Sequence, residues 1–198
     1  NDLVIDAKGG IYFTDPQFTN EATKSRPSKT LNYIRPDGEV ICVIENPGNK
    51  EFQMINGVEL SPDGKTLYVN STYHHEGKVS EAENFIYAYD VKDDGTLANK
   101  RRFCEQFLPV SEWMNHARTS TSDGMVVDAQ GNLYTATDIG LQIFNPKGEF
   151  IGMVHTPTFP VSVCFGGPNY DTLFMTCWDK IYTIQTNVKG LVYPLQSK

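Results

Sequence analysis

A fourfold internal repeat restricts the fold of this chain more than any other feature of its sequence. Each copy consists of a short apolar run, a turn centred on glycine and a second apolar run. The copies span Asn1–Asp15, Asn56–Ser71, Asp123–Asp138 and Val161–Trp178. A second half follows each copy, and its turn glycines, spaced 57, 53 and 42 residues apart, are Gly38, Gly95, Gly148 and Gly190. Short strands that recur about every 40–50 residues are typical of β-propeller blades.

The apolar runs predict strands, and no segment predicts a helix of useful length. The runs are rich in Val, Ile, Tyr, Phe and Thr and are bounded by Asp-Gly, Lys-Gly or Gln-Gly pairs. The sequence therefore predicts an all-β fold, with residues 1–198 forming a single propeller domain of about four blades. The first residue falls inside an expected strand, and four blades alone would leave open sheet faces. We therefore expect the N-terminal blades of this propeller to be absent from the chain.

Charge and hydropathy argue against two classes of partner. The chain carries 17 basic and 24 acidic side chains, for a net charge of −7, and its longest basic run is Lys100–Arg102. An acidic surface repels phosphate backbones, so we expect no nucleic acid partner. No apolar stretch reaches the roughly 18 residues of a membrane-spanning helix, so we expect no membrane partner.

The cysteines bear on metal chemistry and on location. They lie at positions 42, 104, 164 and 177, and no two of them form a Cys-x-x-Cys pair. This spacing argues against a cysteine-based zinc site. Because the cysteines lie in or at the end of expected strands, we interpret all four as reduced core thiols, although the sequence leaves a disulfide open. Reduced thiols favour a cytoplasmic location, but a signal peptide ahead of Asn1 would make the protein periplasmic, so the location stays open.

The expected loops differ between the two ends of the sheets. In an up-and-down meander, tight glycine turns lie at one end and the other connections at the opposite end. Those other connections are long, and they span Pro16–Thr30, Glu45–Ile55, Thr72–Asn84 and Glu105–Ser122. The first position of three repeat copies, occupied by Asn1, Asn56 and Asp123, falls at the long-loop end. Because function concentrates in long loops on a rigid scaffold, we expect the site at this end.

Asn1, Asn56 and Asp123 are the candidate metal ligands. Equivalent positions of propeller blades converge on the axis, which would place two side-chain amides and one carboxylate in one small volume. These hard oxygen donors favour Ca²⁺, with Zn²⁺, Mg²⁺ and Mn²⁺ as alternatives. Asp123 could also act as a general base or nucleophile on an ester-like substrate. The alternative interpretation is that the three side chains only cap turns through hydrogen bonds to the backbone.

Further side chains at the long-loop end are candidates for contact with substrate or for support of the ligands. Trp113 and His116 lie in one long loop and are predicted, with Asn1, to contact substrate. Trp178 falls at the same level and is a candidate to line the mouth of the propeller. Residues at the ends of the second strands are predicted to support the ligands by hydrogen bonds or to close the blade rim, and they are Asp15, Asn70, Ser71, Thr137 and Asp138.

Four motifs, in order along the chain, resemble the SMP-30/gluconolactonase family of six-bladed propellers. They are NDLVIDAKGGIYFTDP, NGVELSPDGKTLYV, SDGMVVDAQGNLYTAT and VCFGGPNYDTLFMT. The last motif is most similar to the bacterial gluconolactonase branch. The resemblance implies one divalent metal, usually calcium, with Asn56 and Asp123 among its ligands and Asn1 touching the metal or the substrate. It also implies a glutamate ligand on the first blade, which has no counterpart in this chain.

The resulting hypothesis is a metal-dependent hydrolase that opens sugar lactones. The metal would polarise the lactone carbonyl, and Asp123 would serve as base or nucleophile. Two alternatives stay open. One is a non-catalytic propeller that binds a protein or peptide on its long-loop face, and the other is a promiscuous arylesterase or phosphotriesterase with the same metal site. As partners we expect a small-molecule lactone and, at most, a weak dimer contact between otherwise monomeric chains.

Overall fold

The computed structural model describes residues 1–16, 30–45, 52, 54–72, 84–107 and 121–192, and these residues form four antiparallel sheets. Sheet 1 contains β1 (Leu3–Ile5), β2 (Ile11–Asp15), β3 (Thr30–Ile34) and β4 (Val40–Glu45). Sheet 2 contains β5 (Ile55–Leu60), β6 (Thr66–Ser71), β7 (Phe85–Val91) and β8 (Leu97–Glu105). Sheet 3 contains β9 (Met125–Val127), β10 (Leu133–Thr137), β11 (Gly140–Phe144) and β12 (Phe150–Val154). Sheet 4 contains β13 (Pro160–Gly166), β14 (Thr172–Cys177) and β15 (Ile181–Gln185).

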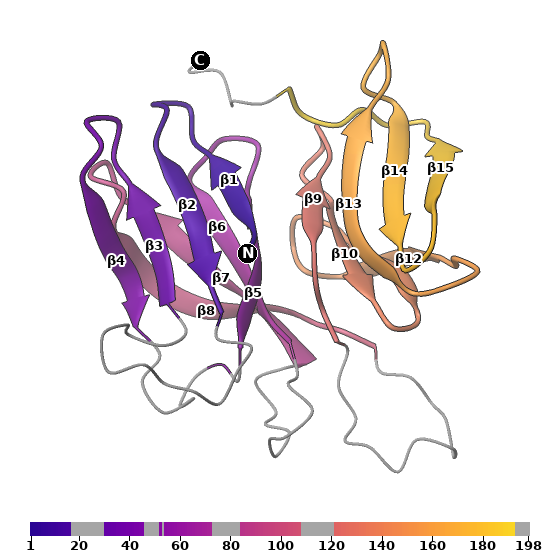
Figure 1. Ribbon diagram of the computed structural model, residues 1–198, viewed down its shortest axis with the longest axis horizontal. Helices are drawn as coiled ribbons and strands as arrows, with labels where there is room; N and C mark the ends of the chain where they lie inside the picture. Colours follow the sequence, from indigo (N-terminus) through magenta and orange to yellow (C-terminus); the bar gives the residue numbers. More distant parts are fainter. Residues whose placement is uncertain (17–29, 46–51, 53, 73–83, 108–120, 193–198) are drawn as a thin grey trace.

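The sheets are arranged like the blades of a propeller, with their first strands next to one another (Figure 1). β1 contacts β5, β5 contacts β9, and β9 contacts β13. The strands within each sheet pair in chain order, as a meander requires. The predicted all-β fold with about four blades is therefore confirmed, and the closure of six blades around the axis stays a prediction.

Tight turns join strands at the end opposite the first residue of each repeat. In six of these turns, a glycine amide donates to the carbonyl oxygen three residues earlier, as Gly9 does to Asp6 and Gly38 does to Arg35. The six turn glycines have φ angles between 68° and 93° and are Gly9, Gly38, Gly64, Gly95, Gly131 and Gly148. Side chains with a Cβ atom disfavour this region, which explains why glycine marks the period of the repeat.

The fourth repeat differs from the prediction in its second half. Within the described residues, sheet 4 has three strands, and Gly190 does not form the predicted hairpin turn. Gly190 instead forms an isolated bridge with Asp128 of sheet 3, and the Ala129 amide donates to the Lys189 carbonyl oxygen over 2.8 Å. The chain after β15 thus crosses back toward sheet 3 (Figure 1). Backbone pairing with a different sheet replaces the hairpin that the local Lys-Gly pair predicted.

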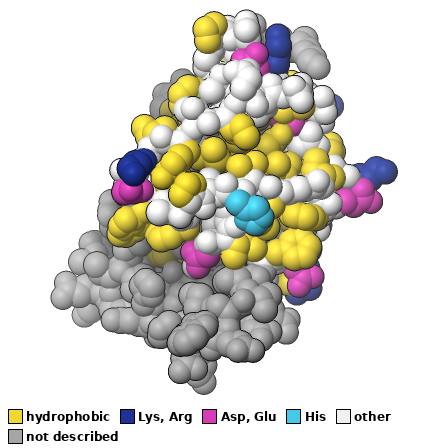
Figure 2. Space-filling view, turned by 90° about the vertical axis from the view of Figure 1, so that its right-hand side faces the viewer, with side chains coloured by type: hydrophobic (Ala, Val, Ile, Leu, Met, Phe, Trp, Pro, Cys, Tyr) yellow, Lys and Arg dark blue, Asp and Glu magenta, His cyan; other side chains and the backbone are white. Residues whose placement is uncertain are grey.

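The apolar core lies between neighbouring sheets. One cluster of buried side chains joins sheets 1 and 2, another joins sheets 2 and 3, and a third joins sheets 3 and 4. The far face of sheet 4 carries a broad apolar patch (Figure 2), to which Trp178, Ile181 and Phe159 contribute exposed side chains. Within the described ranges, no helix is long and apolar enough to cross a membrane.

The prediction that all four cysteines are core thiols is wrong for two of them. All four are free thiols, but Cys42 and Cys164 are exposed, whereas Cys104 and Cys177 are buried. Successive side chains of a strand point to opposite faces, and the partners that cover a face come from elsewhere in the chain. Cys164 lies between Val163 and Phe165, which pack against sheet 3, so its own side chain points away from that sheet.

Candidate metal centre

The structure brings the side chains of Asn1, Asn56 and Asp123 together at the first strands of sheets 1, 2 and 3. Asn1 Nδ2 donates a hydrogen bond to Asn56 Oδ1. Asn56 Nδ2 in turn donates to Asp123 Oδ1 over 3.0 Å. Residues 55 and 67 positions apart along the chain therefore form one hydrogen-bonded row. The convergence that the repeat predicted is present, and the role of the row as a metal site stays a prediction.

A β-bulge presents Asn56 to this row. The pairing between β5 and β6 shifts register between Ile55 and Val58, which leaves Asn56 and Gly57 outside the regular ladder. Bulges of this kind commonly re-aim a side chain next to a functional site. A Cβ atom added at Gly57 would collide with the Asp123 carbonyl oxygen, so the backbones of sheets 2 and 3 approach closely here only because this residue is glycine.

Asp123 is held by the backbone of its own sheet and by the next one. Its amide donates to the Ala136 carbonyl oxygen over 3.0 Å, and the following amide, of Gly124, donates to the Val161 carbonyl oxygen over 2.9 Å. Val161 occupies the position in the fourth repeat that Asp123 occupies in the third. The fourth copy therefore supports the site through its backbone and brings no ligand side chain.

The carboxylates in this region are costly to ionise. The pKa of Asp123 is raised to about 6, chiefly by burial and to a smaller extent by the nearby charge of Asp2, and the Asn56 hydrogen bond offsets only part of this rise. Burial also raises the pKa of Asp2, whose carboxylate accepts hydrogen bonds from the amides of Val58 and Leu3, both over 2.9 Å. A cation placed between these groups would favour the ionised form of both.

The donors fit a hard divalent cation. They are the carboxylate of Asp123 and the amide oxygens of Asn1 and Asn56, with the carboxylate of Asp2 close by. In the part of the chain that the structure describes, no ion pair joins Asp123 to a basic side chain, so a cation would supply the missing countercharge. No three His, Cys, Asp or Glu side chains gather closely enough there to hold a metal. Oxygen donors without His or Cys suit Ca²⁺ better than Zn²⁺, and Ca²⁺ would take further oxygen ligands or water to complete its shell.

Among the other sequence-predicted residues, Asp15 ends β2 and Asp138 directly follows β10, and both are partly exposed. The remaining ones fall into three groups. Trp113 and His116 lie outside the described residues. Asn70, Ser71 and Thr137 are buried at the ends of second strands, and the Asn70 side chain donates a hydrogen bond to the backbone carbonyl oxygen of Asp123. Trp178 is 76% exposed and packs against Phe159, with 5.5 Å between ring centroids, rather than against the candidate ligands.

Sequence reasoning missed a buried hydrogen-bonded group behind Asn56. Asn56 Nδ2 lies 3.2 Å from the Ser122 carbonyl oxygen, and Ser122 Oγ lies 2.9 Å from Thr135 Oγ1. Gln106 Nε2 donates to Ser122 Oγ over 2.8 Å. The alternation of Thr135 with apolar neighbours in β10 was the only signal for this group, and it does not distinguish a polar contact in the core from one on the surface.

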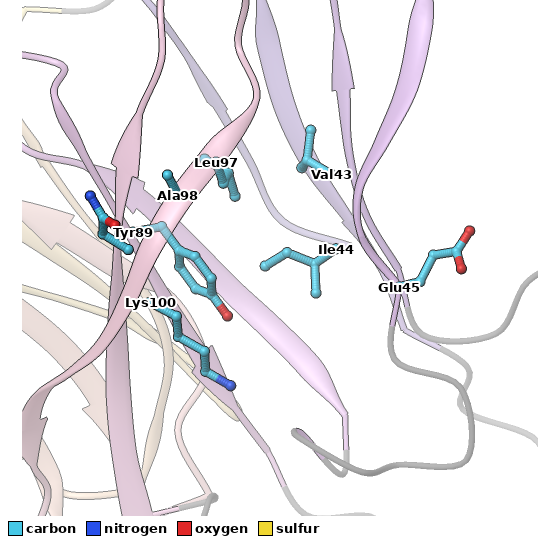
Figure 3. Close-up of a pocket in the computed structure, with 8 residues that line it drawn as sticks. Val43, Ile44, Glu45, Tyr89, Leu97, Ala98 and Lys100 are labelled. Atoms are coloured by element: carbon cyan, nitrogen blue, oxygen red, sulfur yellow. The ribbon is translucent and has the colours of Figure 1, made fainter.

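A hollow of about 360 Å³ lies between the outer strands of sheets 1 and 2 (Figure 3). Its lining residues come from β4, β7 and β8 and are Val43, Ile44, Glu45, Tyr89, Leu97, Ala98, Asn99 and Lys100. In Figure 3, Tyr89 and Lys100 reach into the space that faces Ile44, and Glu45 points away from it. None of the candidate ligands lines this hollow, so it is separate from the candidate metal centre.

Comparison with known proteins identifies the family. The profile of the SMP-30/Gluconolactonase/LRE-like region matches residues 1–178. The chain therefore belongs to the SMP-30/gluconolactonase/LRE-like family, as its four motifs predicted.

Relatives and solved structures agree with this membership. A gluconolactonase of Zymomonas mobilis subsp. mobilis is 29% identical over 196 residues, which cover 96% of this chain and 51% of that protein. A solved gluconolactonase from Xanthomonas campestris is 24% identical, with a TM-score of 0.68 over 93% of this chain and 56% of that one. Regucalcin, a calcium-binding protein from Agrobacterium tumefaciens, is 17% identical, with a TM-score of 0.71 over 100% of this chain and 64% of that one. At these identities the two structures show the fold alone, and the chain spans about half the length of the curated relatives it matches.

Proposed function

We propose that this chain contributes to a metal-dependent hydrolase that opens sugar lactones, as the Zymomonas gluconolactonase does by name. The observation that supports this most directly is the row formed by Asn1, Asn56 and Asp123, which ends on a partly buried carboxylate that forms no ion pair with a basic side chain among the described residues. Family membership makes lactone hydrolysis the activity to test first. The substrate of such a hydrolase would be a small-molecule lactone.

In this proposal Asn56 and Asp123 hold the cation, and Asn1 contacts either the cation or the substrate. The cation, for which Ca²⁺ is the first choice, would polarise the lactone carbonyl when bound. Regucalcin, which shares the fold, is a calcium-binding protein, and this supports the choice of ion.

Asp123 is the residue that we assign to the chemistry. Its carboxylate is mostly ionised at neutral pH, because its pKa is about 6 without a cation and a bound cation would lower that pKa. It can therefore take a proton from an attacking water, or attack the carbonyl carbon itself. The hydrogen bond from Asn56 holds one carboxylate oxygen of Asp123 in place. The assignment of Trp113 and His116 to the substrate stays a prediction.

The test is Asp123→Asn in the full-length protein, assayed for hydrolysis of gluconolactone and for binding of Ca²⁺ by calorimetry. This change keeps the shape of the side chain and removes its charge and its basicity. We expect the rate to fall by about 10²–10⁴-fold, the usual contribution of a general base, and calcium binding to weaken. Asp179→Asn is the matched control, because Asp179 is an exposed carboxylate whose contacts are Thr158 and Lys180. Lactone hydrolysis by Asp123→Asn at the wild-type rate would overturn the assignment.

A further inference from the structure

Asn70 connects the two segments that carry the candidate ligands Asn56 and Asp123. It lies in β6 and is fully buried. Its Nδ2 donates to the Asp123 carbonyl oxygen over 2.6 Å, and its Oδ1 accepts from the Gly57 amide over 2.7 Å. The side-chain amide of Asn70 therefore donates a hydrogen bond to the segment that leads into sheet 3 and accepts one from sheet 2.

The bulge in β5 creates the need for this side chain. The ladder pairs Ile55 with Ser71 and Val58 with Val69, so the buried Gly57 amide has left its place in the regular pairing. A buried amide without a partner costs about 1–3 kcal/mol. Asn70 satisfies this amide, and it therefore stabilises the bulge that presents Asn56.

The same side chain fixes the position of Asp123 relative to that bulge. A bond of 2.6 Å to the Asp123 carbonyl oxygen places sheet 3 against Gly57, where a Cβ atom would not fit. Asn56 Nδ2 then lies 3.0 Å from Asp123 Oδ1. A shift of either segment would change the separation of the two ligand side chains.

We propose that Asn70 is a positioning residue, which sets the spacing between Asn56 and Asp123 and thereby the affinity of the centre for its cation. This inference rests on the proposed function, since it assumes that the two residues hold a cation. It assigns to Asn70 no contact with the cation or the substrate. Residues that orient metal ligands typically contribute about 10–100-fold to metal affinity.

The experiment compares Asn70→Ala with Asn132→Ala by calcium titration calorimetry of the full-length protein. Asn132 offers a matched control, because its Nδ2 donates to Asp128 Oδ2 over 2.7 Å at the tight-turn end of sheet 3, away from the ligands. We expect Asn70→Ala to raise the calcium dissociation constant at least tenfold and Asn132→Ala to leave it within about twofold. Asn70→Ser, which keeps a hydroxyl that can bond one of the two groups, should recover part of the loss. Melting temperatures without calcium show whether each variant is folded.

The outcomes separate this inference from the function on which it rests. If the wild-type protein binds no calcium, the proposed function fails. If it binds calcium and the folded Asn70 variants bind it equally well, the positioning role is wrong. If no Asn70 variant folds, hydrogen exchange of the wild-type protein with and without calcium still tests the role of Asn70. Because coupling is reciprocal, calcium should slow hydrogen exchange of the Gly57 amide, and an unchanged rate there would also refute the role of Asn70.

Discussion

Asp123 shows how position changes the chemistry of an ordinary residue type. An exposed aspartate titrates near 3.9. Burial beside Asp2 raises the pKa of Asp123 to about 6, and the hydrogen bond from Asn56 does not fully offset this. Ionising this partly buried carboxylate destabilises the fold of the metal-free protein, and a bound cation would offset that loss.

Calcium binding should therefore depend on pH around the pKa of Asp123. Below pH 6 the carboxylate is protonated, so a cation has to displace a proton to bind. We expect the calcium dissociation constant to be nearly constant from pH 7 to 8 and to rise by up to about tenfold per pH unit below 6. Calorimetric titrations at pH 5, 6, 7 and 8 measure this. A dissociation constant that stays flat down to pH 5 would contradict the assignment of Asp123 as a ligand.

The metal-free protein should respond to pH in the opposite direction. The folded pKa of Asp123 is raised above its unfolded value, so this group stabilises the fold at acidic pH, and that contribution is lost as pH rises from about 4 through 6. Denaturation with chelator present, at the same four pH values, provides the control for the titration above.

Turns and the bulge determine how the strands are placed. The glycine turns at one end are nearly interchangeable in backbone geometry, but their surroundings differ. A Cβ atom at Gly38 would meet nothing within 4 Å, whereas one at Gly95 would collide with the ring of Tyr33 in sheet 1. The turn at Gly95 is thus also part of the packing between sheets 1 and 2.

Replacing these two glycines should separate backbone strain from packing. Gly38 and Gly95 have φ angles of 93° and 82°, so alanine at either position is strained by about 1–2 kcal/mol. Gly95→Ala should lower the free energy of unfolding by a further 1–3 kcal/mol, roughly the cost of overpacking a core. Urea denaturation of the two variants and the wild type measures the difference. Equal losses in both variants would show that Tyr33 moves aside without cost.

Between sheets, buried tyrosines join the first blade to the second. Tyr12 Oη donates to the Gly95 carbonyl oxygen over 2.8 Å, and Tyr33 Oη donates to Asp6 Oδ2 over 2.6 Å. The two rings pack with 4.4 Å between their centroids. Burial raises the pKa of both phenols above the ordinary value of 10, and for Tyr33 the hydrogen bond to Asp6 raises it further.

The whole molecule should therefore be sensitive to alkali. Since the folded pKa of these phenols is raised, their contribution to stability is complete below about pH 10 and is lost as pH rises above that value. We expect the urea midpoint to be constant from pH 8 to 9.5 and to fall steeply from pH 10 to 11. In Tyr33→Phe, one titrating phenol is absent, so the midpoint should be lower at pH 8 but fall less steeply above pH 10. A wild-type midpoint that does not change up to pH 11 would contradict this.

Local periodicity and glycines at positions of positive φ were enough to predict the turns and the four sheets, and the four motifs were enough to predict the family. The sequence also predicted that Asn1, Asn56 and Asp123 would lie together, since equivalent positions of a radial repeat converge. The partners of these residues could not be predicted. Asn70, at the end of its strand, gave no sign of which sheet its amide would reach. The sequence around Gly190 did not indicate that this residue would pair with Asp128. The strands that contain Cys42 and Cys164 did not indicate which of their faces would be covered. Those outcomes depend on contacts between segments distant in sequence, which arise only when the sheets pack together.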